Sequence, residues 1–106
     1  MSGGGGGGSW TPDSDVQCSR LRFQTQIATP QPGAVLTLRV GDVLDVTVIN
    51  MGGAFAVAVS KNGNVVGGLA GGLVNRLREC LLGGTNFKAT VLTINGAQVM
   101  VEIEPI

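Results

Sequence analysis

Few residues of this chain could carry out acid–base or nucleophilic chemistry, and none of them forms a recognisable catalytic set. The chain has no histidine, so it lacks the commonest general base and the usual partner of a serine or cysteine nucleophile. Asp42 and Asp45 stand three residues apart at the head of an expected strand, which places their side chains on opposite faces. We expect Asp42 to shape a turn and Asp45 to be solvated. The protein is therefore predicted not to be an enzyme.

The other reactive side chains have ordinary structural interpretations. Glu102 and Glu104 share one face of an expected strand, a pattern typical of a charged edge strand. Cys80 falls on the apolar face of an expected helix, which favours burial over nucleophilic activation. Cys18 and Cys80 are predicted to be reduced thiols, with a disulfide between them as the less favoured alternative. With no histidine and no cysteine cluster, we predict no metal site and no cofactor.

Length and composition indicate one small neutral domain. The chain has 106 residues, a formal net charge of zero and a charged fraction of 13%. Residues 1–17 include six consecutive glycines and are predicted to be a flexible glycine-rich leader, followed by a single domain over residues 18–106. No apolar run approaches 18 residues and no signal segment is evident, so we expect no membrane contact and a cytoplasmic location. A neutral chain is also prone to self-association.

A helix is predicted over residues 70–82, and strands are expected on both sides of it. Apolar residues recur there at three- and four-residue spacing, which places them on one face. These residues are Ala70, Leu73, Val74, Leu77, Cys80 and Leu81. Gly83 and Gly84 provide a stop, and Gly71 or Gly72 must serve as the N-cap because no Ser, Thr or Asp stands there. A helix this short needs a sheet to cover its apolar face.

The glycine-rich turn before this helix supports two interpretations. Gly71 and Gly72 could hold an anion on free backbone N–H groups at the helix N-terminus. The turn matches neither the dinucleotide fingerprint nor the P-loop, because the spacing and the following Lys-Ser or Lys-Thr are missing. The favoured interpretation is therefore that the glycines allow a tight bend and close packing.

Alternating apolar residues predict the strands. They occur over residues 20–28, 43–50, 54–60, 87–94 and 98–104, with Asn-Gly hairpin turns at Asn62 and Asn95. Residues 35–39 fit either a strand or a helical turn. We expect Phe55 to point inward, the alanines beside it to be closely covered, and a bulge near Val91. The fold class predicted is mainly β (α+β), a small, partly open antiparallel barrel of about six strands with one helix.

The segment from Ala54 to Ile103 resembles the C-terminal half of HIRAN-type domains. The matching motifs are AFAVAV, NGNVVGGL, RLRECLLGG, FKATV and VMVEI. This resemblance implies a small OB-like barrel that binds single-stranded DNA ends or assists DNA-processing enzymes. The family's Asn-Pro-x-Asp turn and most of its aromatic and basic contacts are missing, so no functional residue is carried over. The chain also resembles small uncharacterised bacterial proteins with CSRLRF, ATPQP, VGDVLDV and RLRECL in this order, which suggests a bacterial source.

Two binding functions follow from these observations. The favoured one is a protein-interaction module or accessory subunit of a bacterial assembly, which uses a protein partner or a second copy. Its candidate contact residues are Trp10, Gln24, Gln26 and Met100. The alternative is binding of single-stranded nucleic acid through a basic groove. Its candidate residues are Arg20, Arg22, Arg39, Arg76, Arg78 and Lys88. A third possibility, a small-ligand sensor at the glycine-rich turn, is less favoured.

Overall fold

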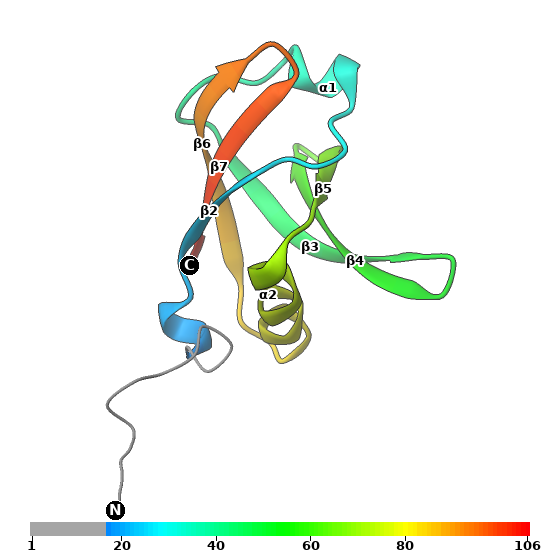
Figure 1. Cartoon of the computed structure of the whole chain (residues 1–106), viewed down its shortest axis with the longest axis vertical. Helices are drawn as coiled ribbons and strands as arrows, with labels where there is room; N and C mark the ends of the chain where they lie inside the picture. The colour runs from blue at the N-terminus through cyan, green and yellow to red at the C-terminus, as the bar shows by residue number, and fades with distance from the viewer. Residues whose placement is uncertain (1–16) are drawn as a thin grey trace, which may run out of the picture.

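The computed structural model describes residues 17–106, which form one antiparallel sheet with two helices and a short 3-10 turn (Figure 1). In this part of the chain the sheet has six strands in the order β2-β7-β6-β3-β4-β5. The elements in chain order are η3 (Cys18–Arg20), β2 (Phe23–Gln26), α1 (Pro32–Val35), β3 (Val43–Met51), β4 (Ala54–Lys61), β5 (Asn64–Leu69), α2 (Gly72–Leu82), β6 (Phe87–Asn95) and β7 (Gln98–Pro105). The predicted mainly β class, with about six strands and one main helix, is confirmed.

The sheet curls until its first and last strands meet at one point, but it does not close. A single bridge joins Ile27, just after β2, to Leu69 at the end of β5. Next to it, the Ala28 N–H donates to the Gly68 carbonyl at 2.8 Å. Register shifts after Val91 and after Val59 mark two bulges, which help a sheet to bend. The predicted bulge near Val91 and the partly open barrel are both confirmed.

Gly67 allows the segment that follows β2 to pass close against β5 at this bridge. A Cβ atom at this position would lie 2.7 Å from the Thr29 carbonyl oxygen and would overlap the Ile27 side chain. The neighbouring Gly68 N–H donates to the Thr29 hydroxyl at 2.9 Å. The close packing predicted for the glycine-rich turn is therefore confirmed at Gly67.

Helix α2 begins and ends at glycines, as the sequence predicted. Gly71 is the N-cap, with φ of 125° and no side-chain capping bond, and Gly84 after the helix has φ of 103°. Val74, Leu77 and Cys80 are buried, and the predicted first residue, Ala70, is exposed before the helix begins. The ambiguous segment after α1 is a helical turn and not a strand, because Thr37 and Leu38 donate backbone bonds three residues back.

The core lies between the concave face of the sheet and α2. Alternate strand positions fill it, as the two-residue period requires. Its fully buried side chains include Leu21, Ile27, Leu44, Val57, Val59, Val66, Leu77, Val91, Val99, Val101 and Ile103. Within residues 17–106, no helix combines the length and apolar character needed to span a bilayer.

Three expectations about individual residues are wrong. Phe55 is 51% exposed because its part of β4 extends beyond the core. Glu102 and Glu104 do not mark an edge, since β7 lies between β2 and β6. Cys18 and Cys80 form a disulfide with a Cα–Cα distance of 5.5 Å. The fold places η3 against the buried face of α2, a proximity that 62 residues of separation do not reveal.

Candidate interaction surface

The most distinctive surface feature is the outer half of the β3–β4 hairpin, which extends away from the rest of the fold (Figure 1). Pairing between β3 and β6 ends at Asp45, and pairing between β4 and β5 is confined to the part of β4 from Val57 onward. Residues 49–56 therefore form a two-stranded ribbon, and residues 46–48 continue it along β3 with no described strand on their outer edge. We call residues 46–56 the arm. Gly52 and Gly53, with φ of 62° and 89°, form the primed two-residue turn that fits a twisted hairpin.

The arm carries no ionisable side chain. None occurs between Asp45 and Lys61, although both ends of this interval are charged. Met51 is 63% exposed and Phe55 51% exposed. Natural proteins usually protect a free sheet edge with charge, proline or a covering element. Here the sequence leaves an apolar ribbon without charge protection.

The β3 side of the arm is its open edge. In an antiparallel pair, peptide groups alternate between the partner strand and the opposite edge. Because Met51 and Ala54 flank the two-residue turn and exchange bonds with each other, the N–H and C=O groups of Val48 and Asn50 point away from β4. On the β4 side, Arg78 Nη1 of helix α2 donates to the Phe55 carbonyl at 3.2 Å. The edge of β4 is thus partly occupied by α2.

An apolar cleft of about 290 Å³ lies at the base of the arm on the convex face of the sheet. Ile49, Met51, Ala56 and Val65 contribute to its lining. The close covering predicted for the alanine face is confirmed at Ala58, which is fully buried. Toward the turn of the arm this covering ends, so that Ala56 is half-buried and Ala54 is exposed. The cleft therefore extends the apolar surface of the arm toward the body of the fold.

The basic residues predicted to bind nucleic acid do not form one patch. The strand register aligns Glu104, Lys88 and Asp45 in one row across the convex face, and Arg22 lies next to Glu104 at the end of this row. Arg22 forms an ion pair with Glu104 at 3.4 Å, and Lys88 lies between two carboxylate-bearing neighbours in the row. This alternation of charge offsets the positive field that a nucleic-acid groove requires. Arg20 is exposed at the end of η3.

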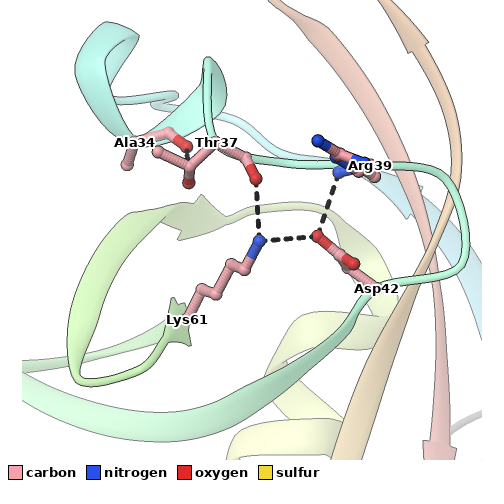
Figure 2. A network of polar contacts seen from close by, with 5 residues as sticks. All are labelled: Ala34, Thr37, Arg39, Asp42 and Lys61. Atoms are coloured by element: carbon pink, nitrogen blue, oxygen red, sulfur yellow. Dashed lines mark hydrogen bonds and ion pairs between the residues drawn. The ribbon is translucent and has the colours of Figure 1, made fainter.

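Arg39 belongs to a polar network that anchors the connection between α1 and β3 (Figure 2). Lys61 Nζ donates to the Thr37 carbonyl at 2.7 Å and to Asp42 Oδ2 at 2.8 Å. The Arg39 backbone N–H donates to the same carboxylate at 2.9 Å. The hydrogen bond from Lys61, followed by that from Arg39, lowers the pKa of Asp42 below its ordinary value. The predicted turn-shaping role of Asp42 is confirmed.

A second pocket, of about 630 Å³, lies between β2 and the start of α2. It brings together Gln24, Gly71, Gly72 and Arg76, which the sequence had assigned to three different binding roles. Glu79 also lines this pocket and forms an ion pair with Arg76 at 3.2 Å. The carboxylate reduces the attraction of the helix N-terminus for an anion.

The predicted protein-contact residues that the structure describes lie away from the arm. Gln24 and Gln26 are exposed on β2, and Met100 is half-buried opposite Gln26. Trp10 lies outside the described residues. Sequence reasoning missed the arm itself, although the long uncharged interval around the predicted Gly-Gly turn was the available signal.

No family model matches this chain, and no curated protein or solved structure shows significant similarity to it. The HIRAN resemblance therefore stays a prediction.

Proposed function

We propose that this protein is a non-enzymatic interaction module that binds a protein partner through the arm, as an accessory subunit of a bacterial assembly. The main support is the uncharged ribbon with a free β3 edge. A partner strand would hydrogen-bond to the peptide groups of Val48 and Asn50, as in other cases of strand addition. Met51 and Phe55 are 63% and 51% exposed, so burial of their exposed parts would add about 1–2 kcal/mol for each side chain. An aromatic anchor beside a sheet edge suits a binding hot spot.

A photo-crosslinking amino acid at position 55 tests this proposal in the cells of origin. The matched control carries the same group at Leu36, which is 87% exposed and lies outside the arm. We expect a discrete protein adduct at position 55 that is absent at position 36. The adduct is identified by mass spectrometry, and the Phe55→Ser variant should lose co-purification with the identified protein. Equal labelling at both positions, or no adduct at position 55, would refute a role for the arm.

Single-stranded nucleic-acid binding stays the alternative, supported by the adjacent exposed Arg20 and Arg22 at the start of β2. A labelled single-stranded oligonucleotide, titrated at low and moderate salt, tests it by fluorescence anisotropy. Saturable binding that weakens steeply with salt and is lost in the double variant Arg20→Glu, Arg22→Glu would favour this alternative. Absence of binding at low salt would exclude it.

A cytoplasmic location is also a proposal, and the Cys18–Cys80 disulfide opposes it. Cytosolic proteins generally keep their thiols reduced, whereas disulfides persist in oxidising compartments. Alkylation of free thiols during cell lysis, followed by intact-mass measurement, tests the location. Two alkylated cysteines would support the cytoplasm, and an unmodified mass would support an oxidising compartment.

A further inference from the structure

We propose that the partner strand at the arm is a second copy of this chain, which pairs with β3 edge to edge across a two-fold axis to form a homodimer. This inference rests on the proposed function, because it names the occupant of the same surface. It is supported by the position of the free edge, the absence of charge on the arm and the side chains that the symmetry brings together.

The position of β6 determines the register of such a pair. Strand β6 lies beside residues 43–45 of β3, so an incoming strand can use only the edge beyond Asp45. Centring the two-fold axis on Ile49 pairs residues 47–51 of one copy with residues 51–47 of the other. Val48 of each copy then exchanges two hydrogen bonds with Asn50 of the other copy, which gives about four interchain hydrogen bonds. An axis nearer the body would bring the incoming turn against Lys88, which already pairs with Asp45.

The side chains in this register are compatible with self-pairing. Ile49 faces Ile49 of the second copy in the type of pair whose side chains lie closest together. Thr47 of each copy faces Met51 of the other copy. These side chains lie on the convex face, where Ile49 and Met51 also line the apolar cleft, so pairing adds apolar contacts there. Two identical charged edges would repel, but residues 46–56 bring no charge to the contact. The formal net charge of zero removes the longer-range repulsion as well.

The contact is small for a dimer interface. Five paired residues span about 17 Å of strand. A standard stable interface buries about 800 Å² on each partner, which exceeds what one strand edge supplies. We therefore expect reversible dimerisation that depends on protein concentration, and not an obligate dimer.

Sedimentation equilibrium of the full chain over a concentration series is the first test. We expect the mass to rise from 10.8 kDa toward twice that value. Ile49→Lys places two like charges opposite each other and should weaken dimerisation about tenfold or more. An equimolar mixture of Ile49→Lys and Ile49→Glu should restore it, because only a two-fold axis at Ile49 pairs these side chains. Leu36→Lys is the matched control and should dimerise like the unmodified chain.

A nitroxide label on a cysteine introduced at Thr47 provides a second measurement that does not alter Ile49. Both natural cysteines are in the disulfide and do not take the label. The proposed register places the two labels within about 20 Å, which broadens the spectrum through dipolar coupling. A label at Thr93, which is exposed on β6 outside the arm, should show no broadening.

The outcomes separate this inference from the proposed function. Concentration-dependent dimers that the Lys and Glu mixture restores, with broadening at position 47 only, support the homodimer. A monomer at all concentrations, or a dimer unaffected by Ile49→Lys, overturns it. If the crosslink at position 55 then captures a different protein, the proposed function holds while the homodimer fails. A crosslink to a second copy supports both.

Discussion

Reduction of the Cys18–Cys80 disulfide should remove a large part of the stability of this domain. The bond closes a loop of 62 residues between η3 and α2. In the chain-entropy treatment, a loop of this length restricts the unfolded chain by about 4 kcal/mol at 25 °C. Small domains have total unfolding free energies of roughly 5–15 kcal/mol. Loss of this bond is therefore expected to leave the fold marginal.

Urea unfolding of the oxidised and reduced protein, followed by far-ultraviolet circular dichroism, measures this effect. With a denaturant slope of about 1–3 kcal/mol/M, the midpoint should fall by roughly 1–4 M on reduction. The variant Cys18→Ser should match the reduced protein and should not respond to reductant. Cys18 is the better position to change, because Cys80 is buried against the core and its replacement would add a packing defect. Equal urea midpoints for the oxidised and reduced protein would refute the stabilising effect of the disulfide.

Two further predictions concern packing and pH. Gly67→Ala should destabilise the fold by about 1–3 kcal/mol in the same assay, since its Cβ meets the Thr29 backbone. Gly72→Ala, with open space around its Cβ, should be neutral or stabilise by up to about 1 kcal/mol; the reverse order would refute the close approach at Gly67. The lowered pKa of Asp42 means that its stabilising contribution is present above the ordinary carboxyl pKa and is lost as pH falls through the folded value. Thermal melts of the unmodified chain and Asp42→Asn should therefore differ at neutral pH and converge below about pH 4, and a constant difference across that range would contradict the assignment.

The sequence was informative wherever local physics determines the structure. The two-residue alternation predicted the inner face of β7, with Val99, Val101 and Ile103 all buried. The phase shift near Val91 predicted the bulge because an extra residue reverses every following side chain. Glycines predicted the ends of α2, since only a residue without Cβ readily adopts the backbone found at Gly71.

The candidate surface could not be predicted in the same way because it depends on distant pairings. Phe55 follows the same alternation as Val57 and Val59, so its pattern alone indicates burial. It is exposed because β5 ends opposite Val57 and leaves the outer part of β4 without a neighbour. For a related reason the disulfide was only the less favoured alternative, and the charge row through Arg22 and Lys88 was missed. Both depend on which strands and helices the fold places side by side.

The architecture itself indicates that the arm acts outside the core. Strand β5 leaves β4 at Leu69 to enter α2, and β6 runs beside β3 only as far as Asp45. Apart from Val46, which is buried at the base of the arm, none of the arm's residues belongs to the buried core among the described residues. Their side chains therefore add little to the burial that holds the domain together, while they expose an uncharged edge that favours association. Core packing does not explain this length of hairpin, and the proposed contact with another chain would account for it.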